Sequence, residues 1–168
     1  MFGVAKSDLP NSALLRRYAD KPGHHTDCFR TTASGTVSIA AFIEAFFGSP
    51  VLRLERKILS LFGAPSTDTD VTALASGEGH ALAAWSVETR NDTQLLLTVF
   101  GGGIRTWLMV EPDGNRTKLL FGSAVVPKNT ETGQPKIGRT VSLLKGFHLL
   151  YSRVVLAAAR WQLNRRRT

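Results

Sequence analysis

The sequence is poor in the residues that crosslink small proteins or bind metals. It contains one cysteine, Cys28, which excludes an internal disulfide framework and a multi-cysteine zinc site. His24, His25 and Asp27 lie close to it. However, adjacent histidines in an extended segment point to opposite sides, and no later His or Cys pair completes a metal site. We therefore predict no metal centre, and a lone cysteine fits a reducing compartment.

Long apolar runs are also missing. The longest run, residues 147–159, contains Arg153 and is shorter than the roughly 18 residues expected of a transmembrane helix. Residues 1–10 lack the basic-then-apolar pattern of a signal peptide. These absences predict a soluble, cytoplasmic protein.

The chain lacks the short motifs that identify many enzymes. It has no nucleophile elbow, Walker loop or HExxH motif. The glycines at 101–103 are not followed by Lys-Ser/Thr, so they do not form a phosphate loop. We predict no cofactor. If the protein is an enzyme, its acid or base is expected among Asp27, His148 and Tyr151.

Acidic residues are scarce relative to basic ones. The 168 residues include 21 Lys and Arg against 13 Asp and Glu, giving a formal net charge of +8. Such a surplus favours nucleic acid, acidic lipid headgroups or acidic ligands as partners. The length and the hydrophobic content of 43% suit one globular domain over residues 1–168. Within it, residues 1–22 are expected to be irregular apart from a short turn of helix at Ser12 to Tyr18, and residues 164–168 to form a basic tail.

What the chain does contain is a β-rich region at residues 81–126. Four strand-like segments are separated by turn signals at 91–92, 101–103 and 112–115. Residues 104–111 alternate with a period of two, because successive side chains of a strand point to opposite faces. The short connections predict an antiparallel meander. One face of it is apolar, and the other carries large mixed side chains.

Three helices are predicted before the meander, after an early strand at 26–32. Ser38 and Ser49-Pro50 are helix-start signals, and Thr67 with Asp70 has the spacing of a capping box. The helix after Ser38 has an apolar face formed by Ile39, Phe42, Ile43, Phe46 and Phe47. The next helix has an apolar side formed by Leu54, Ile58, Leu61 and Phe62 and a basic side formed by Arg53, Arg56 and Lys57. We expect the basic side to face solvent, with an anionic partner as the alternative.

One long helix is predicted at residues 139–163. Its tightest apolar stripe consists of Leu143, Phe147, Leu150, Val154, Ala157 and Trp161. Because further apolar residues surround this stripe, the helix is expected to be buried on more than one side. It could lie between the sheet and a neighbour, line a cavity, or join a homodimer. The polar loop at 127–138, which contains two prolines, is expected to be a linker or a lid.

This order of elements resembles the helix-grip fold of the START and polyketide-cyclase-like (SRPBCC) superfamily. The segments TDCFRTT, FIEAFFGSPVLRLERKILSLF, the meander and GFHLLYSRVVLAAARWQL carry the resemblance. The chain is also similar to a group of bacterial single-domain proteins of this type, with a similar FGSAVVP strand end and GFHLLYSR helix. The resemblance implies an α+β fold whose sheet wraps around the last helix, with two or three helices inserted after the first strand. It also implies an apolar ligand between sheet and helix.

The leading hypothesis is therefore a binding protein for a small apolar or amphipathic molecule, such as a lipid, quinone or polyketide-like compound. The candidate lining residues are Trp85, Arg105, Trp107, Met109, His148 and Tyr151. Alternatively, Trp107, Met109 and His148 are plain core residues. Arg105 would pair with an anionic group of the ligand or with Glu88 or Glu111.

Two other classes of function remain open. One is an enzyme of cyclase or hydratase type that uses the same cavity. The other is peripheral contact with an anionic membrane through a basic set formed by Arg53, Arg56, Lys57, Arg165, Arg166 and Arg167. Nucleic acid ranks last as a partner, because aromatic residues are not interleaved with these basic residues as in single-strand binders.

Overall fold

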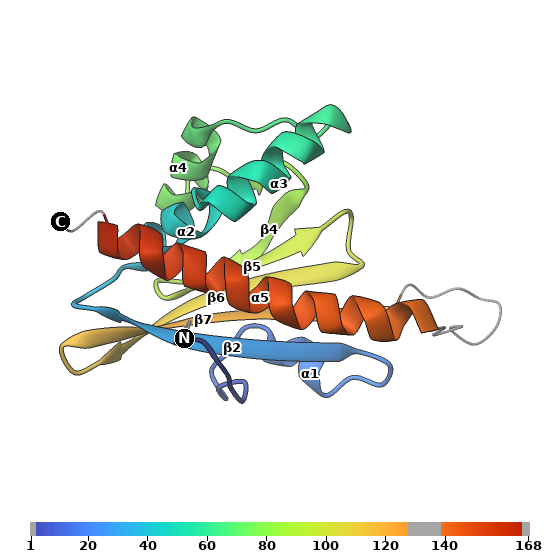
Figure 1. Ribbon diagram of the computed structural model, residues 1–168, viewed down its shortest axis with the longest axis horizontal. Helices are drawn as coiled ribbons and strands as arrows, with labels where there is room; N and C mark the ends of the chain where they lie inside the picture. Colours follow the sequence, from blue (N-terminus) through green and yellow to red (C-terminus); the bar gives the residue numbers. More distant parts are fainter. Residues whose placement is uncertain (1–2, 128–138, 166–168) are drawn as a thin grey trace.

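The computed structural model has an α+β fold in which one antiparallel sheet carries helices on its inner face (Figure 1). It describes residues 3–127 and 139–165, and for residues 139–148 it describes the helical backbone without the side chains. The strands are β1 (Ala5–Lys6), β2 (His25–Ser34), β3 (Ala81–Leu82), β4 (Trp85–Arg90), β5 (Gln94–Val99), β6 (Ile104–Asp113) and β7 (Arg116–Val125). The helices are α1 (Arg16–Ala19), α2 (Ile39–Phe47), α3 (Pro50–Leu61), α4 (Asp68–Ser76) and α5 (Arg139–Arg165).

The sheet order is β1-β2-β7-β6-β5-β4-β3, and all pairs are antiparallel. The meander predicted at residues 81–126 is confirmed as strands β4 to β7. The early strand is also confirmed, and it pairs along its whole length with β7. The sequence patterns missed β1 and β3, because a strand of two residues is too short to show an alternation.

The inner face of the sheet packs against α2 and α5. Alternate residues such as Phe29, Leu97, Leu108 and Leu119 are fully buried there, as a period of two requires. The predicted apolar face of α2 is buried against them. This layer forms the main core of the protein.

Local capping signals place the helix starts. The Ser38 hydroxyl accepts a hydrogen bond from the backbone of Ala41 at the start of α2, and Ser49 serves α3 in the same way. The capping box of Thr67 and Asp70 is present at the start of α4. Gly77 ends α4 in the left-handed region, where a residue without a Cβ meets no steric penalty.

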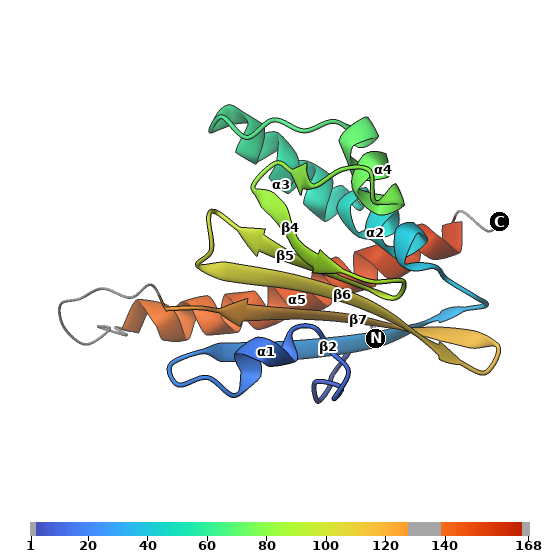
Figure 2. The same cartoon turned by 180° about the vertical axis from the view of Figure 1, so that it is seen from behind.

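The outer face of the sheet is covered by the N-terminal segment and α1 (Figure 2). Leu15 and Tyr18 pack there against Leu96, Trp107 and Met109 in a second buried cluster. The side chain of Gln94 anchors the segment, because its Oε1 accepts from the Trp107 indole (2.9 Å) and from the backbone of Leu14 (2.8 Å). The short helix expected at Ser12 to Tyr18 is present as α1, but the strand β1 and the contribution of this segment to the core were not expected.

Helix α3 lies with its apolar side outward. Of its basic residues, Arg53 and Lys57 are exposed as expected, but Arg56 is not. The main contacts of α3 are with α5 and α2, and its C-terminal end rises away from the sheet (Figure 1). Leu61 and Phe62 are each 82% exposed, whereas Arg56 is 5% exposed. The assignment of Arg56 to a solvated basic surface is therefore wrong. The reason is that a set of polar partners, described below, surrounds its guanidinium.

Candidate functional site

The residues predicted to line one ligand cavity lie on opposite faces of the sheet. Trp85 is buried in the inner core against Phe47, and Tyr151 packs at the edge of the same core. Trp107 and Met109 are buried in the outer cluster. Arg105 follows their alternation and also lies on the outer face. The sixth residue, His148, falls among side chains that the structure does not describe. The five described residues therefore do not share one cavity.

Arg105 has an internal partner, which was one of the two alternatives for it. Its Nε donates to a Glu88 carboxylate oxygen at 2.6 Å and to the Tyr18 hydroxyl at 3.1 Å. Its guanidinium also lies over the Tyr18 ring, 4.8 Å from the centroid. Burial and the hydrogen bond with Glu88 raise the pKa of Tyr18. This network anchors α1 to the strands β4 and β6.

A polar row crosses the inner face near one end of the sheet. Asp27 is buried, and its carboxylate accepts hydrogen bonds from the Ser123 backbone (3.0 Å) and hydroxyl (2.9 Å). On the neighbouring strand, the Thr106 hydroxyl accepts from the Trp85 indole at 3.3 Å. The apolar side chains of Ile104 and Val125, beside this row, are about half exposed. The first half of α5 passes over the same end of the sheet (Figure 1).

The outward side of α3 is a continuous apolar stripe. Its members follow helical spacing, and each has about half or more of its surface exposed: Leu54, Ile58, Leu61 and Phe62. The buried contacts of α3 are made instead by Leu52 and Arg56. An amphipathic helix normally turns its apolar side to the core, so this orientation leaves an apolar surface that the described residues do not cover.

Helix α5 presents a second apolar stripe beyond its core contacts. Its buried side consists of Ser152, Val155, Leu156, Ala159 and Leu163. The stripe that the sequence predicted is turned outward in its described part, where Leu150 is 61% exposed and Val154 and Trp161 are also exposed. The described part of α5 thus packs against the sheet and against α2 and α3, while the predicted stripe stays exposed in the single chain.

A polar pair joins the two helices beside these stripes. The Tyr151 hydroxyl donates a hydrogen bond to the Glu55 carboxylate. Burial raises the pKa of Glu55, although the hydrogen bond from Tyr151 works in the opposite direction. The pKa of Tyr151 is also raised, first by burial and then by the neighbouring carboxylate. Ile58 and Phe62 follow Glu55 at helical spacing, so the α3 stripe borders this seam.

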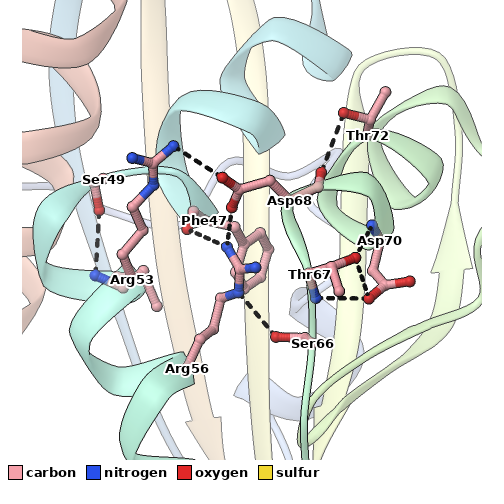
Figure 3. Close-up of polar contacts among 10 residues, drawn as sticks. Phe47, Ser49, Arg53, Arg56, Ser66, Thr67, Asp68, Asp70 and Thr72 are labelled. Carbon is pink, nitrogen blue, oxygen red and sulfur yellow. Dashed lines mark hydrogen bonds and ion pairs between the residues drawn. The ribbon is translucent and has the colours of Figure 1, made fainter. Parts of the chain in front are cut away.

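The basic residues of α3 line an open cleft between α3 and the start of α4 (Figure 3). The cleft has a volume of about 360 Å³ and is lined by Arg53, Arg56, Lys57, Ser60, Ser66, Thr67 and Asp68. Arg56 forms its floor: its Nε donates to Ser66 (2.9 Å) and its Nη1 to Asp68 (3.1 Å) and to the Phe47 carbonyl (3.3 Å). Arg53 donates to the other Asp68 oxygen at 3.2 Å.

Other reactive groups give less indication of function. Burial raises the pKa of Cys28 to about 12, so this thiol is protonated and a poor nucleophile at neutral pH. Within residues 3–127 and 139–165, no three His, Cys, Asp or Glu side chains are arranged to hold a metal ion. No helix in this part of the chain is long and apolar enough to cross a membrane.

The sequence patterns found the basic residues and the stripes but not the arrangement that joins them. Ser66 and Asp68 were missed as partners of Arg56, although both directly flank Thr67, the first residue of the predicted capping box. Of the predicted basic set, Arg53, Arg56 and Lys57 come together at the cleft. Arg165 lies apart from them over the Trp161 ring, and Arg166 and Arg167 fall outside the described residues. Residues 128–138 of the loop predicted to be a linker or a lid also fall outside the described residues.

Comparison with known proteins adds no identification: no family model matches the chain, and none of the curated proteins or solved structures compared with it is significantly similar.

Proposed function

We propose that this protein is a peripheral binding module for anionic lipid surfaces, which it contacts with the outward sides of α3 and α5. The observation that carries the proposal is the pair of exposed apolar stripes on these helices. Monomeric proteins rarely leave contiguous apolar patches of more than a few hundred Å² in water, and larger ones mark interaction sites. Shallow insertion into a bilayer would cover both stripes at once.

Charge favours an anionic bilayer as the occupant. The sequence of α5 contains no Asp or Glu, and Arg153 and Arg165 are exposed. Arg160 is instead half-buried and donates a hydrogen bond to Thr31. The single acidic residue of α3, Glu55, is hydrogen bonded to Tyr151 at the seam. Arg53 and Lys57 lie on the exposed basic side of α3, next to its apolar stripe. The two helices therefore present apolar groups and cations, the combination that interfacial helices use on acidic membranes.

The energies are sufficient for reversible binding. Full burial of one Leu, Ile or Phe side chain is worth about 1.5–3 kcal/mol, and each cation near an acidic surface about 1 kcal/mol. Partial insertion of several of these side chains, together with the basic residues, therefore supplies the two signals that stable anchoring requires.

Vesicle co-sedimentation tests this proposal. The probe is a set of vesicles of phosphatidylcholine with increasing phosphatidylglycerol, and the variant is Leu61→Ser combined with Phe62→Ser. We expect the double variant to bind about tenfold more weakly or worse, because two apolar side chains are lost from the contact. The matched control is Phe100→Ser, since Phe100 is 67% exposed but lies at the β5–β6 turn, away from both stripes.

Two outcomes contradict the proposal. One is wild-type protein that ignores the phosphatidylglycerol content, and the other is an equal loss of binding in the Phe100→Ser control. Sedimentation equilibrium of the lipid-free protein tests whether a second copy of the chain covers the stripes instead. A stable dimer that Leu61→Ser and Phe62→Ser dissociate would assign the stripes to a second copy of the chain.

A second candidate function follows from the polar row on the inner face. The strand order, the helices between β2 and β3, and the position of α5 support the helix-grip class. In that class an amphipathic molecule lies between the sheet and the last helix. Asp27, Ser123 and Thr106, bordered by the open side chains of Ile104 and Val125, supply the few polar groups that such a ligand needs.

Native mass spectrometry of the purified protein tests the second candidate. We expect a small-molecule adduct on the wild type and its loss from Ile104→Arg, which places a charge at the half-exposed edge of the row. Vesicle binding by the same variant should be unchanged. A clean ligand-free mass for the wild type would contradict this candidate and leave the lipid-surface proposal intact.

A further inference from the structure

The cleft between α3 and α4 contains a buried cation whose hydrogen-bonding capacity is only partly used. Arg56 is 5% exposed, and its Nε and Nη1 make the three bonds described above. An arginine has five N–H donors, and the hydrogen bonds of Arg56 to the described residues use Nε and Nη1 but not Nη2. In Figure 3 this nitrogen points towards the segment that precedes α4. Only His24 Nδ1 and Ser152 Oγ are both fully buried and unpartnered among the described residues, so Arg56 Nη2 reaches solvent and is open to an acceptor that enters the cleft.

Further donors surround the same space. Ser66 accepts a hydrogen bond from Arg56 and therefore retains its own hydroxyl proton to donate. Lys57 is exposed at the rim, and it makes no ion pair with any residue that the structure describes. Arg53 uses one nitrogen on Asp68 and keeps the others. The hydroxyls of Ser60 and Thr67 are already engaged with backbone or side-chain partners.

The charge of the cleft selects a class of ligand. Among the residues that line the cleft, three cations face the single carboxylate of Asp68, a surplus of two positive charges. Asp70 of the capping box does not line the cleft, although its hydrogen bonds with Thr67 and, to a smaller extent, Arg56 lower its pKa. A phosphate monoester carries about −1.5 to −2 charges at neutral pH and has three strong acceptor oxygens. Arginine matches such oxygens in pairs, and lysine adds a mobile point charge.

We propose that this cleft is a binding site for a phosphate monoester, held by Arg56 Nη2, Lys57, Arg53 and the Ser66 hydroxyl. Asp68 orients both guanidinium groups and reduces the positive charge of the cleft to an amount that the phosphate monoester neutralises. The site depends on the cleft alone and does not require the lipid-surface function. A soluble phosphate ester and the headgroup of phosphatidic acid present the same chemistry to it.

Binding of glycerol 3-phosphate, followed by calorimetry and by amide chemical shifts, tests the site. We expect saturable binding, with shifts confined to residues 53–60 and 66–68. Lys57→Gln should weaken it about tenfold, the worth of one charge-assisted hydrogen bond. Ser66→Ala should weaken it less. Arg116→Gln is the control, because it removes an equally exposed cation at the distant β6–β7 turn. No saturation, or an equal loss in Arg116→Gln, overturns the proposal.

Vesicles separate the two sources of the phosphate group. Phosphatidic acid is a monoester and phosphatidylglycerol a diester, so vesicles of matched charge differ in the group that the cleft recognises. Preferential binding to phosphatidic acid, lost in Lys57→Gln and displaced by glycerol 3-phosphate, identifies a lipid headgroup. Equal binding to both lipids, with glycerol 3-phosphate still bound, identifies a soluble ester. The Leu61→Ser and Phe62→Ser variant should retain glycerol 3-phosphate binding, so failure of one proposal is distinguishable from failure of the other.

Discussion

Helices α2 and α3 are neighbours in the chain and are both amphipathic, yet they face the core in opposite ways. In α2 the apolar residues, among them Phe42 and Phe47, are fully buried. In α3 the apolar stripe faces solvent, and the helix buries Leu52 and Arg56 instead. Periodicity thus shows that a helix has two sides, but the neighbouring elements decide which side is buried.

The partners of Arg56 account for the orientation of α3. A buried arginine is tolerated only when its charge and donors are satisfied. The Phe47 carbonyl at the end of α2, together with Ser66 and Asp68 at the start of α4, supply that environment. Rotating α3 to bury Leu61 and Phe62 would remove Arg56 from these groups.

The largest expected contrast between the two helices is in the cost of truncating their apolar side chains. Phe42→Ala should lower the free energy of unfolding by about 3–5 kcal/mol, because it leaves a cavity in the core. Ile58→Ala in α3 should change it by less than about 0.5 kcal/mol, as expected for a surface substitution. Denaturant unfolding measures both. A large loss in Ile58→Ala would show that α3 buries its stripe after all.

A smaller effect is expected from the arginine that determines the contrast. Arg56→Met keeps much of the volume but leaves the Phe47 carbonyl and the Ser66 hydroxyl without a donor. We expect the free energy of unfolding to fall by about 1–3 kcal/mol. This is less than for a fully buried ion pair, because the Asp68 carboxylate is exposed to solvent. Lys57→Met, one residue further on, is the matched control and should be nearly neutral. If the two variants lowered the thermal stability equally, Arg56 would not be the cause of the orientation of α3.

The smallest expected effect is a pH dependence at the seam between α3 and α5. Burial raises the pKa of Glu55 from its ordinary value of 4.5, so the folded state binds this proton more tightly than the unfolded chain does. The stability of the wild type relative to Glu55→Gln should therefore be greatest below pH 4.5. It should fall as the pH rises through the raised pKa. Unfolding curves of the two proteins across this range provide the difference, and parallel curves would place Glu55 in contact with solvent.

Local signals predicted much of the fold but not how its parts face one another. Ser38, Ser49-Pro50 and the Thr67 capping box placed three helix starts correctly, because capping depends on residues close in sequence. The residues predicted to line one ligand cavity do not come together, because the alternation along β6 puts Trp107 on the face of the sheet away from α5. The same alternation could have grouped Arg105 with Trp107, but it could not show that an N-terminal segment covers that face. Such a contact joins residues 80 positions apart, as in the bond from Leu14 to Gln94.

The pairing of β2 with β7 has a consequence for the order in which the protein folds. The strand β2 leaves the ribosome early, but its ten-residue pairing with β7 joins residues such as Asp27 and Ser123, 96 positions apart. Loop-closure entropy opposes such a contact until the intervening helices and meander have shortened the effective loop. During synthesis, the edge of β2 that pairs with β7 therefore stays unpaired until β7 emerges. During that interval the unpaired edge of β2 is open to pairing with other chains, which is the usual route to aggregation.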